Sequence, residues 1–125
     1  MPAQTPFLEG EAALAPLASR YVDVEALPWK PTPTPGIDMK ILLQDKESGL
    51  LTALFRWAPG SKLPLHEHVD LEQTFVLEGT LVDEEGIATA GNYVWRPQGS
   101  RHMAVAPDGA IVLSFFLRPN KFMET

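Results

Sequence analysis

Three histidines and one carboxylate carry the chemistry that this sequence offers. His66 and His68 lie two positions apart in a segment predicted to be extended, and alternate side chains of a strand point to the same face. Glu72 follows four positions later and keeps the same parity if residues 69–71 stay extended, a count that a turn would change. His102 follows a separate turn and would supply a third nitrogen from another strand. The pattern predicts one bound divalent transition metal.

The grouping of these residues favours a metal over isolated structural roles. A single histidine is more often a hydrogen-bonded core or surface residue than a ligand. Burying three imidazoles and a carboxylate without a partner is costly, whereas one divalent cation compensates all of them. The chain has three histidines and no cysteine, which excludes thiolate ligands, disulfides and a cysteine nucleophile. Nitrogen and oxygen ligands suit Fe(II), Zn, Ni, Mn or Cu, and ligand type alone does not choose among them.

Length and charge restrict the class of protein. A chain of 125 residues, 45% of them hydrophobic, can bury one core and is expected to form one domain. The net charge of -6 argues against nucleic acid and anionic membranes as partners. No apolar run is long enough to span a membrane, and residues 1–10 lack the positive region of a secretory signal. We therefore expect a cytoplasmic protein that acts on a small molecule.

From Ile37 onward the sequence predicts short strands separated by turns. The predicted strands are residues 37–43, 50–57, 71–77, 80–83, 93–96, 102–105 and 110–117. Turn chemistry separates them, for example at residues 58–60, 78–79 and 97–99, where glycine and proline cluster. No stretch of comparable length shows a helical period. The pattern predicts an all-β fold, a sandwich or closed barrel of antiparallel strands.

Residues 1–36 differ in composition from the rest. They hold most of the prolines, including the alternating run at 31–36, which favours extended, polyproline-like chain. We expect an extended Pro-rich N-terminal arm at residues 1–36, with a short helical turn within 9–17, and a barrel domain at 37–125. Apolar side chains of the arm, such as Tyr21 and Trp29, would pack either on their own barrel or on a second subunit.

The two metal-binding segments resemble the motifs of the cupin superfamily. The first motif is matched by Gly60, His66, His68, Glu72 and Gly79, and the second by Gly91, Pro97, Gly99 and His102. Ala106 replaces the asparagine that closes the second motif, a departure that touches no ligand. The resemblance implies a cupin double-stranded β-helix, or jelly-roll, barrel. It also implies that His66, His68, Glu72 and His102 bind one metal and leave positions open for water, substrate or dioxygen.

A finer resemblance covers residues 21–36 and 49–60, which are similar to cupins related to acetylacetone-cleaving and 2,4'-dihydroxyacetophenone dioxygenases. The same subgroup contains the zinc-binding cupin domain of anti-sigma factors. This resemblance implies an Fe(II) dioxygenase, an oxidoreductase that cleaves a carbon-carbon bond in a small diketone or hydroxyaryl ketone, and a homodimer. The acetylacetone-cleaving type uses three histidines without the carboxylate, whereas Glu72 is present here. The alternatives are a non-catalytic ligand sensor, a metal-dependent hydrolase or isomerase, and a purely structural metal.

Strand parity suggests further residues for the site. Arg56 could orient an anionic enolate, although an arginine near a strand end is more often a solvated partner of an acid. Four large apolar residues could line a pocket, or could instead fill the barrel core. They are Phe75, Trp95, Met103 and Phe115.

Overall fold

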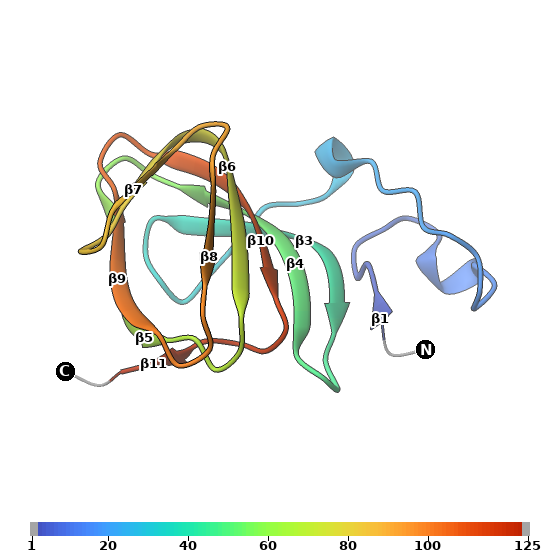
Figure 1. The fold of residues 1–125 in the computed structure, drawn as a ribbon. Coiled ribbons are helices and arrows are strands. Elements are labelled where there is room, and N and C mark those ends of the chain that lie inside the picture. The colour runs from blue at the N-terminus through green and yellow to red at the C-terminus, as the bar shows by residue number, and fades with distance from the viewer. Residues whose placement is uncertain (1–2, 124–125) are drawn as a thin grey trace.

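Antiparallel strands paired into one curled sheet make up the fold (Figure 1). The computed structural model describes residues 3–123, which contain two short 3-10 turns, at Glu11–Ala13 and Val24–Ala26, and no α-helix. None of the helical segments in this range could cross a membrane. The strands are β1 Ala3–Gln4, β2 Lys30–Pro31, β3 Ile37–Asp45, β4 Leu50–Trp57, β5 Ser61–Glu67, β6 Glu72–Val82, β7 Ile87–Thr89, β8 Tyr93–Arg96, β9 Arg101–Ala106, β10 Ala110–Phe116 and β11 Lys121–Phe122. The prediction of an all-β jelly-roll barrel is confirmed.

Strand β6 links the two walls of the barrel, because it pairs with β8 and β10 in one wall and with β7 and β9 in the other. The strand order is β1-β3-β4-β10-β6-β9-β5-β11, with β2 added to β3, and with β7 and β8 added to β6. Residues 72–79 of β6 pair with β10 and residues 72–75 with β8, whereas residues 80–82 pair with β7, and Val82 also with β9. One long strand thus passes from one wall to the other.

The turn predicted at residues 78–79 is wrong. Instead of reversing, β6 continues through Gly79, beside a shift in its register with β10. Gly79 has φ +77°, and a Cβ atom there would lie 2.1 Å from the carbonyl oxygen of Gly109. The position therefore admits only glycine, because a side chain would meet neighbouring backbone that cannot move aside. Glycine has the same signature in a strand irregularity as in a turn, which is why the sequence pattern misplaced it.

The hydrophobic core fills one end of the barrel interior. Its buried members come from β3, β4, β6, β9 and β10, and they are Ile37, Trp57, Val76, Leu81, Ala104, Ala106, Ala110 and Val112. Along several of these strands the inward-facing residues change from apolar to polar. On β10, for example, Val112 and Ser114 are both buried, two positions apart, but only Val112 is apolar. The inward face of the barrel therefore has an apolar end and a polar end.

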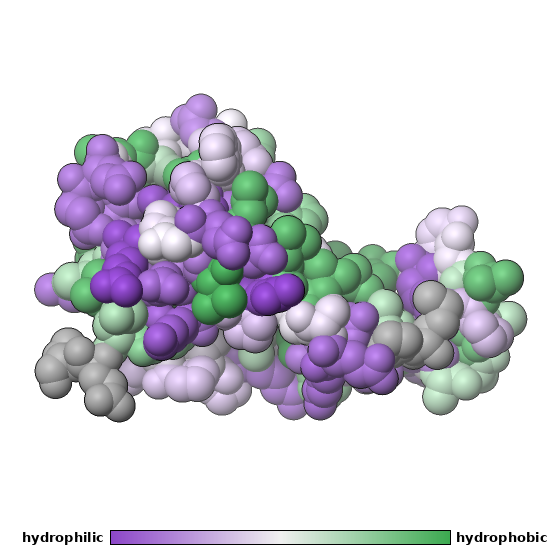
Figure 2. Space-filling model, turned by 60° about the horizontal axis from the view of Figure 1, so that its bottom comes forward, coloured by the Kyte–Doolittle hydropathy of each residue, from purple (hydrophilic) through white to green (hydrophobic). Residues whose placement is uncertain are grey.

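The segment before β3 runs out to one side of the barrel (Figure 1). It is tied back by pairing of β1 and β2 with β3, and by the Lys40 Nζ that donates a hydrogen bond to the Val24 carbonyl over 2.9 Å. Leu27 is buried, whereas Tyr21 is 89% exposed. Figure 2 shows this segment as a lobe beside the barrel. The face of the barrel that is turned forward in this view is mostly hydrophilic. The division into an arm at 1–36 and a barrel at 37–125 stays a prediction.

Candidate metal centre

The three histidines lie together at the polar end of the barrel. His66 of β5 and His102 of β9 are cross-strand partners, and His68 follows directly after β5. One ring nitrogen from each histidine lies within 4.8 Å of the other two, and all three side chains are buried. The Nε2 atoms of His68 and His102 are 2.7 Å apart. The sequence prediction that these three residues converge is confirmed.

The turn of the second motif holds His68 in place. The backbone N–H of His68 donates to the Ser100 carbonyl over 2.9 Å, and the N–H of Gly99 donates to the His68 carbonyl over 2.7 Å. Gly99 has φ +86°, a conformation that glycine adopts without strain and that lets the turn fold back on this backbone. His68 thus keeps an inward direction although it lies past the end of β5.

Backbone acceptors select the tautomers of two of the histidines. His66 Nδ1 lies 2.8 Å from the Pro64 carbonyl oxygen, and His102 Nδ1 lies 3.1 Å from that of Met103. A carbonyl only accepts, so each Nδ1 must carry the proton and donate it. Each Nε2 is then unprotonated, which is the form in which imidazole binds a metal. With its proton on Nδ1, His102 can only accept in the 2.7 Å contact between its Nε2 and that of His68.

Burial keeps the imidazoles neutral. It lowers the pKa of His66 to about 4 against the opposing hydrogen bond to Pro64, and the charges of His102 and Arg96 add smaller lowering effects. It lowers the pKa of His68 to about 3, with the other two histidines adding to the effect. Burial, followed by the Arg96 charge, also lowers the pKa of His102. At neutral pH the cluster therefore offers unprotonated nitrogens, as metal binding requires.

Glu72 contacts the histidine cluster through His68. It begins β6 after the chain leaves extended geometry at residues 68–71, and its Oε1 lies 3.3 Å from His68 Nδ1. That contact is not aligned as a hydrogen bond, and His68 Nδ1 has no hydrogen-bond partner among the residues described. The other oxygen, Oε2, accepts a hydrogen bond from Thr74 Oγ1 over 2.8 Å, and Thr74 in turn lies 2.8 Å from Ser114 Oγ. Burial raises the pKa of Glu72.

These observations fit a bound metal. His66 and His102 present unprotonated Nε2 atoms, and one nitrogen of each of the three rings lies within 4.8 Å of the other two. Glu72 is outside the compact group that the three nitrogens form. His66, His68 and His102 are therefore the residues that could hold the ion, and the carboxylate touches one of them.

An ion pair that sequence reasoning missed lies beside the cluster. Arg96 of β8 is the cross-strand partner of Glu72, is buried, and forms an ion pair with Asp83. Asp83 Oδ2 is also 3.6 Å from His102 Nδ1. Burial would raise the Asp83 pKa, but hydrogen bonds from Glu85 and Gly86 and the Arg96 charge hold it below its usual value. A sequence signal existed, because Arg96 ends a strand in which outward and inward positions alternate.

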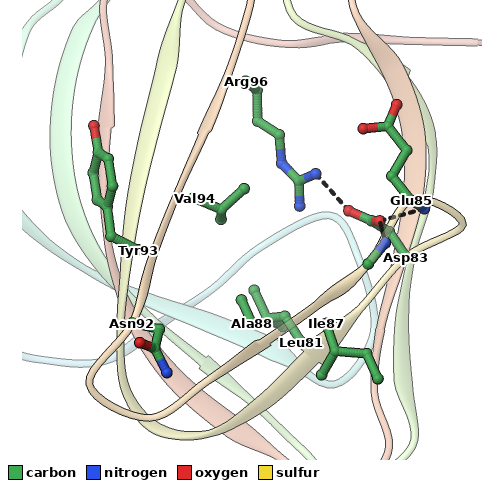
Figure 3. Close-up of a pocket in the computed structure, with 10 residues that line it drawn as sticks. Leu81, Asp83, Glu85, Ile87, Ala88, Asn92, Tyr93, Val94 and Arg96 are labelled. Carbon is green, nitrogen blue, oxygen red and sulfur yellow. Dashed lines mark hydrogen bonds and ion pairs between the residues drawn. The ribbon is translucent and has the colours of Figure 1, made fainter.

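Two cavities adjoin this ion pair. The larger has a volume of about 280 Å³ and is lined by Leu81, Asp83, Ile87 and Arg96 among others (Figure 3). The smaller, of about 170 Å³, reaches His102. Three residues line both, and they are Glu85, Val94 and Arg96. Arg96 therefore borders both the larger cavity and the one that reaches His102.

The large apolar residues proposed for the pocket point outward instead. Phe75, Trp95, Met103 and Phe115 are between 38% and 54% exposed. Their sequence neighbours Thr74, His102 and Ser114 are the ones that face inward, so the parity is shifted by one residue. Of the four only Trp95 lines a cavity, the smaller one.

Arg56 is likewise not brought to the cluster. It is exposed on β4, pairs with Asp38 over 3.1 Å, and places its guanidinium carbon 4.3 Å from the centre of the Trp29 ring. Neither of the two cavities includes it. The position is that of a solvated partner of an acid.

Comparison with known proteins identifies the family. Residues 17–120 match the family described as the ChrR cupin-like domain. The chain belongs to this family. No curated protein matches this ChrR-like cupin significantly.

Solved structures share the fold of this ChrR-like cupin. One is a protein of Methylibium petroleiphilum proposed to be an acetylacetone dioxygenase, with 28% identity, a TM-score of 0.79, and coverage of 89% of this chain and 85% of that one. An acetylacetone dioxygenase from Acinetobacter johnsonii has 24% identity, a TM-score of 0.77, and coverage of 86% and 79%. The complex of Rhodobacter sphaeroides SigE with the anti-sigma factor ChrR contains a chain with 28% identity and a TM-score of 0.63. That match covers 74% of this cupin and half of the other chain.

Proposed function

We propose that this cupin is a metal-dependent dioxygenase that cleaves a carbon-carbon bond in a small diketone or hydroxyaryl ketone, with Fe(II) as its metal. The observation that carries the proposal is the cluster of three neutral, buried histidines, one of which, His102, lines a cavity. The similarity to the protein of M. petroleiphilum proposed to be an acetylacetone dioxygenase, over 89% of this chain, supports the reaction class.

Each residue of the site has a role in this reaction. The unprotonated Nε2 atoms of His66 and His102, together with His68 Nε2, would hold the ion, and the ion would supply activation of dioxygen and of the substrate oxygens. Glu72 Oε1 lies 3.3 Å from His68 Nδ1 and would orient that ring once Nδ1 carries the proton, while Thr74 donates a hydrogen bond to Glu72. The barrel wall keeps the cluster largely free of water.

Oxygen consumption tests the reaction class. Protein loaded with Fe(II) without oxygen and then exposed to air should consume oxygen above background with at least one member of a panel of diketones and hydroxyacetophenones. The zinc-loaded protein is the matched control, because zinc is not redox-active. Background uptake with the whole iron panel, in protein shown to hold iron, would contradict the proposal.

A ligand sensor is the second candidate function. The match to the ChrR family and to a chain of the SigE–ChrR complex favours it. In that case the metal site would bind a small molecule without turnover. Uptake at background, together with metal-dependent binding of a diketone, would favour the sensor over the enzyme.

We also propose that the protein is a homodimer. Support comes from the outward face of β8, β6 and β10, where large exposed apolar side chains lie on neighbouring strands. They are Phe75, Leu77, Tyr93, Trp95, Phe115 and Leu117. A patch of this kind is typical of a protein interface. Light scattering should give twice the mass of the chain for the native protein and a monomer for Phe75→Glu, and a native monomer would contradict the proposal.

A further inference from the structure

We propose that Arg96 binds an anionic oxygen of the substrate, so that the substrate is a small oxo acid rather than a neutral diketone. The inference rests on the proposed function, whose substrate class it narrows. It starts from an arginine that is buried inside the barrel and has a donor to spare.

The guanidinium of Arg96 is only partly satisfied. One terminal nitrogen is paired with Asp83, but the buried Nε has no hydrogen-bond partner among residues 3–123. A buried donor without an acceptor is costly, and most native structures satisfy such groups. The flat guanidinium matches a carboxylate, which would accept from the part of the guanidinium that lines the cavities.

The position of Arg96 puts its guanidinium beside both cavities. Arg96 lines both cavities, and the smaller of them reaches His102. Figure 3 shows the guanidinium turned toward Asp83, with Leu81, Ile87 and Ala88 across the larger cavity. A ligand there could place a carboxylate on Arg96, its hydrocarbon part against these apolar residues, and its oxo groups toward the histidines. The volume of about 280 Å³ suits a ligand smaller than a drug molecule.

The acidic residues around Arg96 decide whether it attracts an anionic ligand through a long-range positive field or only by direct hydrogen bonding. Asp83 is fully engaged, with Oδ2 on Arg96 and Oδ1 accepting from the N–H groups of Glu85 and Gly86 over 2.8 and 2.9 Å. The pair has no net charge, so Arg96 contributes a fixed hydrogen-bond donor rather than a positive field. The exposed carboxylate of Glu85 also lines both cavities, but solvent screens its repulsion of an anion. Selectivity for an acid must therefore depend on contact with Arg96.

Binding to a form that does not turn over tests the inference. Zinc-loaded protein is titrated calorimetrically with 2,4-dioxopentanoate and with its methyl ester, which has the same oxo groups but no charge. Native protein should bind the acid at least about tenfold more tightly than the ester, as one charge-assisted hydrogen bond allows. Arg96→Gln should lose that preference and keep its affinity for the ester.

Two further variants keep the result interpretable. Arg96→Gln leaves Asp83 buried without its partner and could lower stability, so the double variant Asp83→Asn/Arg96→Gln removes both charges. Arg56→Gln removes the same charge from an exposed position and should keep the preference. Metal content is measured for every variant, because Asp83 lies near His102.

The outcomes separate this inference from the proposed reaction. Equal affinity of native protein for acid and ester, or binding of neither, overturns the role of Arg96. A preference that survives in both Arg96 variants belongs to the metal and overturns it as well. If the preference depends on Arg96 but iron-loaded protein consumes no oxygen, the anion site stands and the dioxygenase proposal fails. If oxygen is consumed with neutral diketones and there is no acid preference, only the inference about Arg96 fails.

Discussion

The apolar and polar ends of the barrel interior are built by the same strands and serve opposite purposes. Strand β9 supplies Ala104 to the core and His102 to the histidine cluster, and β10 supplies Val112 to the core and Ser114 to the hydrogen bonds around Thr74 and Glu72. All four side chains are buried. The inward face is therefore one surface whose chemistry changes along the strand axis. A strand that continues into the core can hold a ligand rigidly at its other end.

The two ends contribute differently to stability. Burying a valine or leucine side chain contributes roughly 1.5–3 kcal/mol, so the apolar end stabilises the fold directly. Buried imidazoles and a carboxylate lose their hydration and recover it only in part through hydrogen bonds. The polar end gains most when a metal binds, because a ligand that binds only the folded state stabilises it. A substitution at the apolar end should thus lower stability without removing the metal, and a substitution at the polar end should do the reverse.

The largest expected effect comes from removing a ligand at the polar end. His102→Ala removes one of three nitrogens and the neighbour of His68 Nε2 at 2.7 Å, so the metal content should fall from near one equivalent per chain to background. Metal analysis of protein purified without chelator measures this. Met103→Ala, an outward change on the same strand, should keep the metal. A full equivalent in His102→Ala would show that the histidine cluster is not the metal centre.

A matching change at the apolar end should affect stability and not metal. Leu81 is 6% exposed in the core, and Leu81→Ala should lower the free energy of unfolding by about 2–5 kcal/mol through lost burial and a cavity. Urea unfolding of the metal-free protein measures the loss. Ile87→Ala, at an exposed position of β7, should cost much less. Loss of metal from folded Leu81→Ala would show that the two ends are coupled.

Acid should weaken the polar end in the metal-free protein. The pKa values of His66 and His68 are lowered to about 4 and about 3, and that of His102 is also lowered, from 6.5 in the unfolded chain. Between pH 6.5 and about 4 the unfolded chain therefore binds protons that the folded chain does not, and the free energy of unfolding falls as pH falls. The raised pKa of Glu72 acts in the opposite direction, and we expect the three histidines together to exceed it.

Thermal unfolding in the presence of a chelator, at pH 7 and at pH 5, checks this pH dependence. The midpoint should be lower at pH 5. Added metal should raise it more at pH 7 than at pH 5, because protons compete for the same nitrogens. A midpoint that does not change, or that rises on acidification, would mean that the histidines are not held neutral by burial.

The histidine cluster could be predicted from the sequence because it depends on local rules. Period-two spacing placed His66 and His68 on one face, and the turn chemistry before His102 placed it on another strand. The face on which the aromatic residues lie could not be predicted in the same way. Parity fixes which residues share a face of a strand, but not which of the two faces is the inner one. Phe75 and Phe115 were therefore assigned to the wrong side.

Contacts that depend on register between distant strands were out of reach. The pair of Asp83 and Arg96 joins the end of β6 to the end of β8, and nothing in the spacing of these residues predicts it. The passage of β6 from one barrel wall to the other at Gly79 also required the partner strands to be known. The contact of Glu72 with His68 could not be predicted either. Residues 68–71 are not extended, so the alternation of side chains along β5 does not continue to Glu72.

The smallest expected effect distinguishes a ligand from an orienting residue at the border of the polar end. If Glu72 acts through His68 Nδ1, Glu72→Gln keeps an oxygen that can accept, and the metal affinity should fall by about tenfold. If Glu72 binds the ion itself, the loss should approach that of His102→Ala. Competition with a metal-binding dye gives both affinities. Thr74→Val removes the hydrogen bond to Glu72 Oε2, and if Glu72 orients His68, this change should lower the metal affinity by less than Glu72→Gln does. An unchanged metal affinity in both variants would show that the carboxylate does not contribute to metal binding.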